Sequence, residues 1–308
     1  AMHFAWGVPG IASAMALALC VLFFIVRGLK PAARLMQWLV PVIGLVWILV
    51  SLCLSLWHAN LLPGIFTTII KSAFGWQEAA TGTMAYTLSQ AMTSGFQRSM
   101  FANEAGLGSS PNAAAMAASW PPHPVAQGIV QMIGVLTDTF LVCTASALVL
   151  LLAGTVPLSD AFGGIQQLQQ AMASLTGGWG AGFVACIVVL FAFTSIVANY
   201  IYAENNLIFL RCNSNRNLWL LRIGILLMVV AGPILSVPLI WHIADVVMAL
   251  MAMINLTAIL LLSPVVRVLA RDYLRQRKLG VMPVFNPQRY PEIERQLAPG
   301  SWDDIPRL

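Results

Sequence analysis

Charged residues are scarce in this chain. Asp, Glu, Lys and Arg make up only 9% of the 308 residues, whereas an ordinary soluble domain carries about a quarter. Hydrophobic residues make up 59%, and the mean hydropathy is +0.82. A soluble fold could not hide so much apolar surface from water with so little charge to cover it. The composition therefore excludes an ordinary soluble domain and indicates an integral membrane protein, and its long apolar runs predict an all-helical one.

Paired cysteines and the common catalytic motifs are also missing. The five cysteines show no paired spacing, and four of them lie inside apolar runs, so we expect neither a disulfide framework nor a zinc site. The four histidines lie at the ends of apolar runs, and neither Gly-x-Ser-x-Gly nor His-Glu-x-x-His occurs. These absences argue against an enzyme, and the lack of a repeated pore-lining segment argues against a channel.

Basic residues are dispersed along the chain. The net charge is +5, but nucleic-acid-binding proteins gather Lys and Arg on one face. Here the basic residues fall in short gaps between apolar runs, which is typical of a topology signal in a membrane protein. We therefore expect the lipid bilayer as the surroundings, no nucleic-acid partner, no cofactor and no obligate protein partner.

Seven runs are long enough to cross a bilayer, which takes about 20 mostly apolar residues. We place the last two on either side of a tight turn around His242. If the first run ends inside, only Lys71 of the 16 basic residues falls outside, which fits the rule that Lys and Arg stay in the cytoplasm. The runs are 8–26, 36–57, 80–100, 125–153, 181–203, 218–240 and 243–266.

Two further segments flank or connect these runs. Residues 61–76 are amphipathic and too short to cross, which predicts a helix on the outer membrane surface. Residues 279–308 are charged and rich in proline, and we expect a loosely ordered cytoplasmic tail there. The predicted organisation is thus a transmembrane transporter domain over 1–278 and a tail over 279–308.

The stretch from Ser94 to Pro124 is unusually polar and rich in Gly and Pro. It resembles the signature G-x-x-R-x-x-F-(S/A)-N-E-A-G-x-G-S-x-P of the alanine or glycine:cation symporter family, and further similar segments extend from about Pro41 to Tyr273. A phosphate-binding loop is the weaker interpretation, because no Lys-Ser/Thr follows the glycines. The matching positions are Gly95, Arg98, Phe101, Ala102, Asn103, Glu104, Ala105, Gly106, Gly108, Ser109 and Pro111.

This resemblance implies a leucine-transporter-like fold of two inverted five-helix repeats, in which the seven runs correspond to core helices four to ten. It implies sodium-coupled symport of alanine or glycine by alternating access in the plasma membrane, the inner membrane of a bacterium. The alternative is a proton-coupled carrier or one of different amino-acid specificity. We expect a truncated member that lacks the first core helices and does not transport by itself.

The third run would occupy the place of the broken sixth core helix, which meets the substrate in such folds. Its hydroxyl groups and its glycine weaken the helix and free backbone groups for a zwitterion. A polar helix that merely packs against its neighbours is the alternative. The residues that the resemblance places on the substrate face are Gly82, Thr83, Tyr86, Thr87 and Gln90.

The fifth run contains "FAFTSIVANY", where the family's pattern supplies a sodium site. Thr194 and Ser195 are the expected ligands, because a hard cation prefers oxygen atoms. Both hydroxyls could instead bond back to the preceding turn. Many relatives have Gly-Trp where this chain has Ala198 and Asn199, so we place Asn199 in the substrate pocket as a polar replacement for a large apolar wall.

The signature stretch suits an inner gate. Arg98 and Glu104 could form a breakable ion pair, with Asn103 beside them and Gly106 and Gly108 as a hinge. A static cap that only satisfies helix ends is the alternative. Outside the signature, Asp138 and Asn255 lie within spans, where a polar side chain is expected to find a partner.

Overall fold

The structure is a computed structural model that describes residues 1–27, 29–73, 92–93, 95–99, 102–104, 106–154, 164–297 and 302. All regular elements within these ranges are helices, and no strand occurs among them. The chain divides into two compact units. Unit 1 comprises Ala1–Arg98 and Asp138–Asp245, and unit 2 comprises Ser99–Thr137 and Val246–Leu308.

Four helices are long and apolar enough to cross a membrane. Many of their large hydrophobic side chains are exposed, as expected of helices that face lipid rather than water. They agree with the second, fourth, fifth and seventh runs, and a shorter apolar helix, Gly10–Val26, agrees with the first. The total of seven spans stays a prediction. The four long helices are Arg34–Trp57, Pro124–Leu152, Trp179–Phe209 and Val237–Lys278.

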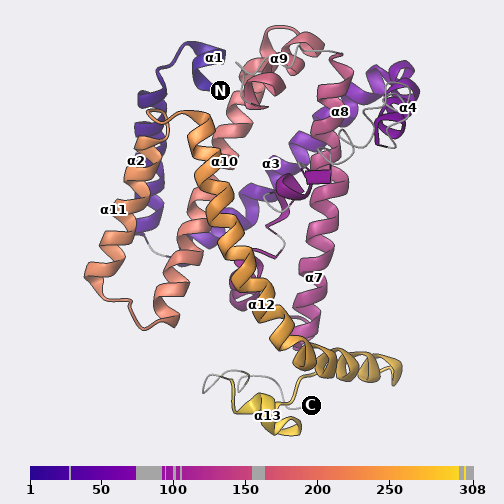
Figure 1. Ribbon diagram of the computed structural model, residues 1–308, viewed down its shortest axis with the longest axis vertical. Coiled ribbons are helices and arrows are strands. Elements are labelled where there is room, and N and C mark those ends of the chain that lie inside the picture. Colours follow the sequence, from indigo (N-terminus) through magenta and orange to yellow (C-terminus); the bar gives the residue numbers. More distant parts are fainter. Residues whose placement is uncertain are drawn as a thin grey trace. The chain divides into compact units, whose positions relative to one another are not determined.

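Unit 1 is built around helix α10, which packs against α2, α3, α9 and α11 (Figure 1). The amphipathic segment near residue 65 is helical as expected and forms α4, whereas its place on a membrane surface stays a prediction. The helices of this unit are α1 (Met2–Trp6), α2 (Gly10–Val26), α3 (Leu29–Trp57), α4 (Leu62–Ala73), α8 (Thr144–Leu152), α9 (Gly164–Thr176), α10 (Trp179–Phe209) and α11 (Asn215–Ala231).

Two buried clusters hold unit 1 together. In the first, Trp47 of α3, Val149 of α8 and Met172 of α9 pack against the first half of α10. In the second, Val21 of α2 packs with Val197 and other residues in the second half of α10. Because lipid is as apolar as these side chains, close van der Waals packing stabilises such contacts in a membrane. The clusters therefore fix α10 along most of its length.

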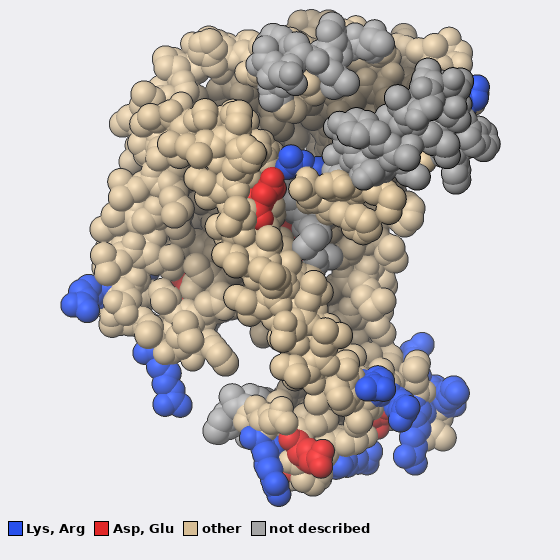
Figure 2. All heavy atoms as spheres, viewed as in Figure 1, with Lys and Arg blue, Asp and Glu red and all other residues tan. Residues whose placement is uncertain are grey.

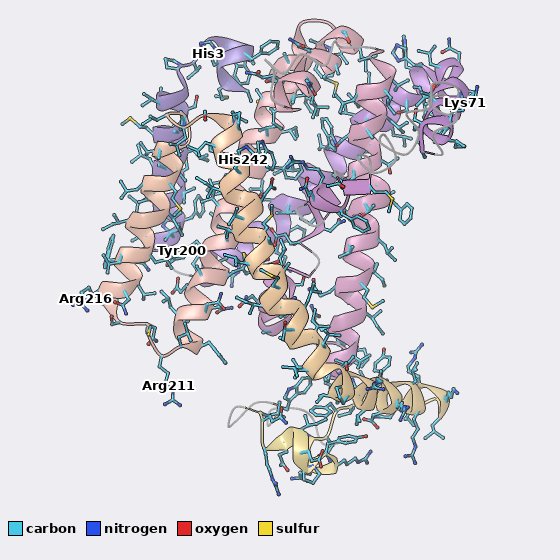
Figure 3. All side chains as sticks on the ribbon, viewed as in Figure 1. His3, Lys71, Tyr200, Arg211, Arg216 and His242 are labelled. Atoms are coloured by element: carbon cyan, nitrogen blue, oxygen red, sulfur yellow. The ribbon has the colours of Figure 1, made fainter. Side chains whose placement is uncertain are left out.

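The turn between α11 and α12 lies earlier in the chain than the sequence predicted. Helix α11 ends before Gly232, and α12 (Val237–Lys278) contains His242, so the predicted turn at His242 is wrong (Figure 3). Pro233 follows Gly232 directly and has no N–H to continue the helix. Pro238 stands in the first turn of α12, where its missing N–H costs nothing.

Unit 2 combines α6 (Ser109–Met116), α7 (Pro124–Thr137), most of α12, a short 3-10 turn (Pro287–Arg289) and α13 (Pro291–Glu294). Helix α7 passes through a π-helical turn, Asp138–Cys143, into α8 of unit 1. The expectation of a loosely ordered tail is wrong for its first part. Phe285 is only 2% exposed, and its N–H donates to the carbonyl oxygen of Pro122 at 2.9 Å.

A pair of buried side chains joins α12 to the segment before α7. His123 lies 3.5 Å from Asp272, measured from Nε2 to Oδ2, and both residues are buried. The His123 Nδ1 accepts a hydrogen bond from the N–H of Val125, which places the ring proton on Nε2, facing the carboxylate. The rings of Tyr273 and Phe285 pack edge-on against the imidazole. We call this arrangement, together with its tail contacts, the clasp.

Candidate functional site

Helix α10 carries the two hydroxyls that were predicted to bind sodium. Thr194 is only 5% exposed, and its Oγ1 donates to the carbonyl oxygen of Phe191 at 2.9 Å. Ser195 is exposed. Successive residues of an α-helix are about 100° apart, because a turn takes 3.6 residues. The Thr194 and Ser195 hydroxyls therefore do not lie on one face of α10. A single cation could contact both only where the buried side of the helix meets its exposed side.

The exposed side of α10 offers oxygen atoms without a charge. Asn199 lies one turn after Ser195, and its Nδ2 donates to the Ser195 carbonyl oxygen at 2.9 Å. This orientation leaves the Asn199 Oδ1 as an acceptor. No hydrogen bond occupies the Ser195 hydroxyl within the described part of the chain. Neutral oxygens of this kind suit a hard monovalent cation or the ammonium group of an amino acid.

The remaining residues of the predicted substrate face lie outside the described residues, so their roles stay predictions. They are Gly82, Thr83, Tyr86, Thr87 and Gln90.

The signature loop packs against α12 through Asn255. The Asn255 Nδ2 donates to the carbonyl oxygen of Gly106 at 2.9 Å. Gly106 and Gly108 have φ values of +87° and +92°, in a region that residues with a Cβ rarely adopt. A Cβ at Gly108 would also lie 3.3 Å from the Asn255 amide. Backbone geometry and the close approach of Asn255 therefore both favour glycine in this loop.

Glu104 shares the unusual backbone of this loop, with φ +48°. It belongs to unit 2 together with Asn103, whereas Arg98 belongs to unit 1, so the ion pair between Arg98 and Glu104 stays a prediction. Within unit 1 the Arg98 guanidinium lies over the ring of Trp241, 4.4 Å from its centroid, a cation–π contact. A hinge and a static cap both remain compatible with the loop.

The acid predicted within the fourth span lies in the π-helical turn. Asp138 is half-buried, and its Oδ2 is 3.9 Å from the Cys143 Sγ, a weak thiol donor. The partner that the structure gives this acid among the described residues is therefore a weak one. A π-helical turn leaves backbone groups less regularly paired and is frequent at functional positions.

A polar cluster between α10 and α11 escaped the sequence reasoning. Tyr200 is buried on the side of α10 that faces α11 (Figure 3), and its Oη accepts a hydrogen bond from the Arg222 Nε at 3.1 Å. The Arg222 guanidinium also lies over the ring of Trp219, 5.2 Å from its centroid. One turn after Tyr200, the Glu204 Oε2 is buried and has no hydrogen-bond partner among the described residues. The sequence did contain a signal for this cluster, because Tyr200 and Glu204 are four residues apart and so lie on the same face of a helix.

Comparison with known proteins gives the family. The chain is 58% identical to the uncharacterized transporter YaaJ of Escherichia coli over 99% of its length, which covers 64% of YaaJ. It is 38% identical to the amino-acid carrier protein AlsT of Bacillus subtilis, over 99% of this chain and 63% of AlsT. It is 41% identical to the probable sodium/glutamine symporter GlnT of the same organism, over 84% of this chain and 52% of GlnT.

The chain thus spans little more than half to nearly two thirds of the length of these relatives. The sequence profile of one family matches residues 1–287, which is a wider range than the similar segments noted from Pro41 to Tyr273. The match includes both polar features described above, the α10 hydroxyl pair and the signature loop held by Asn255. The chain belongs to the sodium:alanine symporter family, a family of membrane transporters and not of enzymes.

Proposed function

We propose that this chain forms part of a sodium-coupled carrier that symports a small neutral amino acid, alanine or glycine, by alternating access. The observation that carries this proposal is the polar face of α10, where Ser195 and Asn199 present neutral oxygens within a largely apolar stretch of the helix. Sodium bound near Thr194 and Ser195 would stabilise the state that accepts the substrate. By linkage, the substrate must then raise the sodium affinity by the same factor.

The choice of amino acid and coupling ion belongs to this proposal. Relatives differ in the substrate that their names give, since GlnT is named for glutamine and the family for alanine. Asn199 supplies an amide on the exposed side of α10, and an amide can pair with a substrate side chain that carries its own hydrogen-bonding groups. A carrier for a larger polar amino acid, or one driven by protons, is therefore the second candidate.

The ends of unit 1 support the predicted sidedness. Arg211 lies in the connection between α10 and α11, and Arg216 lies in the first turn of α11. Lys71 lies toward the opposite end of unit 1, the end that also carries His3 (Figure 3). This separation fits a cytoplasmic end with Arg211 and Arg216 and an outer end with Lys71. We place the carrier in the plasma membrane, the inner membrane of a bacterium, with its C-terminus in the cytoplasm.

The proposal is tested by uptake into proteoliposomes that hold the carrier expressed from its intact gene. Radiolabelled alanine, glycine and glutamine are offered in turn, with and without an inward sodium gradient, to the wild type and to Thr194→Ala/Ser195→Ala. We expect sodium-driven uptake in the wild type and a loss of the sodium dependence in the double variant.

A matched control is Thr67→Ala/Thr68→Ala on α4, which removes two adjacent hydroxyls that each bond back to a backbone carbonyl. It should leave uptake unchanged. Uptake that ignores the sodium gradient but follows a proton gradient would replace the proposed coupling ion. If uptake by the wild type and by the α10 variant depended equally on sodium, the sodium site could not involve the Thr194 and Ser195 hydroxyls.

A further inference from the structure

Helix α12 is too long to lie wholly within a bilayer. It runs from Val237 to Lys278, 42 residues, which at 1.5 Å per residue is about 63 Å, roughly twice the hydrocarbon thickness. No charged residue occurs from 246 to 266. That stretch alone is about 31 Å long, so it matches the hydrocarbon layer. Arg267 and the residues after it then lie at the level of the lipid headgroups.

The C-terminal part of α12 turns away from the rest of the helix. Figure 1 shows the change of direction, and Pro264 lies inside the helix near the end of the uncharged stretch. A proline in a helix interior removes one backbone hydrogen bond and its ring clashes with the preceding turn, which bends the helix. The segment from Arg267 to Lys278, which we call the basic segment, is therefore a separate arm at the end of the span.

The clasp holds one side of the basic segment. Asp272 faces His123, as described above, and its Oδ2 also accepts a hydrogen bond from the Gln276 Nε2 at 3.0 Å. The Gln276 side chain in turn bonds both backbone groups of Val284, at 3.1 Å to the carbonyl oxygen and 2.9 Å to the N–H. These contacts immobilise the arm, so its other side is presented on a rigid support.

A second side of the basic segment, turned about 100° around the helix from Asp272 and Gln276, is exposed and positive. Arg267, Arg271 and Arg275 follow one another at intervals of four residues, and Lys278 lies three residues further, so all four share one helix face. Figure 2 shows Lys and Arg gathered around this part of the molecule. A shallow hollow of about 400 Å³ lies on this side, lined by Arg271, Leu274, Arg275, Lys278 and Leu279.

This positive charge is not neutralised within the described part of the chain. The acid of the basic segment, Asp272, is turned to the buried side, where it pairs with His123. Arg271, Arg275 and Lys278 make no ion pair with described residues. Three cations around the exposed Leu274 match a phosphate group joined to an acyl chain, since the guanidinium fork binds phosphate oxygens and the leucine contacts hydrocarbon.

We propose that the exposed face of the basic segment is a binding site for anionic phospholipid headgroups of the leaflet that this end of α12 meets. The uncharged stretch before Arg267 brings the arm to the headgroup level, and charge complementarity selects an anionic lipid over a zwitterionic one. The clasp holds the helix that carries the three cations in place before the lipid arrives, which lowers the entropic cost of binding. The site is independent of the sodium and substrate sites proposed on α10.

The test uses the carrier from its intact gene, purified in a neutral detergent and titrated with short-chain phosphatidylglycerol, phosphatidylcholine or inorganic phosphate. The thermal midpoint of unfolding is followed at each concentration. We expect saturable stabilisation by phosphatidylglycerol and none by the other two. In Arg271→Gln/Arg275→Gln/Lys278→Gln the half-saturating concentration should rise on the order of a hundredfold, because each basic side chain near an anionic surface contributes a factor of about five.

The matched control is Arg211→Gln/Arg216→Gln/Arg295→Gln, which removes the same charge from three exposed positions elsewhere. It should leave the half-saturating concentration within about twofold. If the triple substitution in the basic segment prevents purification, Lys278→Gln alone should still raise that concentration about fivefold. The proposal would be overturned if the two triple variants lost phosphatidylglycerol affinity equally, or if inorganic phosphate stabilised the carrier as much as phosphatidylglycerol does. It would also be overturned if neither basic-segment variant changed the half-saturating concentration.

Discussion

At the scale of single residues, the signature loop depends on two glycines and one amide. Gly106 and Gly108 adopt a left-handed backbone, and Asn255 both donates to the Gly106 carbonyl and fills the space beside Gly108. The amide thus compensates a backbone acceptor that would otherwise lie unpaired near the membrane interior, where an unpaired group costs several kcal/mol. The loop is held to α12 by this local fit.

Gly108→Ala should therefore lower the stability of the carrier. The left-handed conformation costs an L-residue about 1–2 kcal/mol, and the added Cβ would press on the Asn255 amide. Thermal unfolding in detergent measures the loss. Gly128→Ala in α7 is the control, because nothing lies within 4 Å of the position that its Cβ would take. An unchanged midpoint for Gly108→Ala would contradict the strain described for this loop.

His123 should make stability depend on pH. Burial lowers the pKa of His123, and the nearby carboxylate of Asp272 only partly opposes that shift. Protonation would also turn the Nδ1 acceptor for Val125 into a donor. The other titratable group that faces the ring is Tyr273, while Tyr290, in the adjoining tail, has a pKa raised by burial.

The sign of the pH effect follows from the lowered pKa. An unfolded histidine takes up its proton near pH 6.5, whereas the folded ring does so only at lower pH. The stabilisation by neutral His123 is therefore complete above about pH 6.5 and is lost as the pH falls through the folded-state pKa. Thermal midpoints of the wild type should fall between pH 7.5 and 5.5, and those of His123→Gln should fall less. Parallel pH profiles would contradict this account.

At the scale of elements, the apolar runs predicted helix positions well and helix junctions poorly. The ends of the fourth and fifth spans were predicted to within a few residues, apart from the C-terminal end of α10, because long uncharged runs define them. The junction of α11 and α12 was placed at His242 because hydropathy continues through Gly232 and Pro233. Backbone chemistry, not hydropathy, ends the helix there. The position of such a break can be predicted from the sequence if Gly and Pro are considered before the lengths of the apolar runs.

The tail was misjudged for a different reason. Its charge and prolines indicated a loose extension, yet Phe285 inserts beside His123 and is almost fully buried. Phe285→Ala should cost about 3 kcal/mol, a typical loss for truncating a buried phenylalanine. Val281→Ala, at an exposed position of the same tail, should cost little. Chemical unfolding in mixed micelles provides the measurement, and equal midpoints for the two variants would show that the clasp does not hold the tail.

At the scale of the whole molecule, the sequence predicted the family and the class of protein, because the signature stretch is long and specific. The clasp was not predictable, because His123 and Asp272 are far apart in sequence and neither belongs to a recognisable motif. The predicted sodium-binding and substrate-binding residues were named from the sequence, but the structure tests their roles only in part. The structure shows where Thr194, Ser195 and Asn199 lie on α10, while the predicted substrate residues from Gly82 to Gln90 lie outside its described part.

Coupling between sodium and amino acid is the central claim, and equilibrium binding tests it most directly. The affinity of the carrier from its intact gene for radiolabelled alanine is measured at several sodium concentrations, and its affinity for sodium at several alanine concentrations. The account predicts that each ligand strengthens the other by the same factor, and that Thr194→Ala/Ser195→Ala reduces this factor toward one. Alanine affinity that does not change with sodium would contradict it.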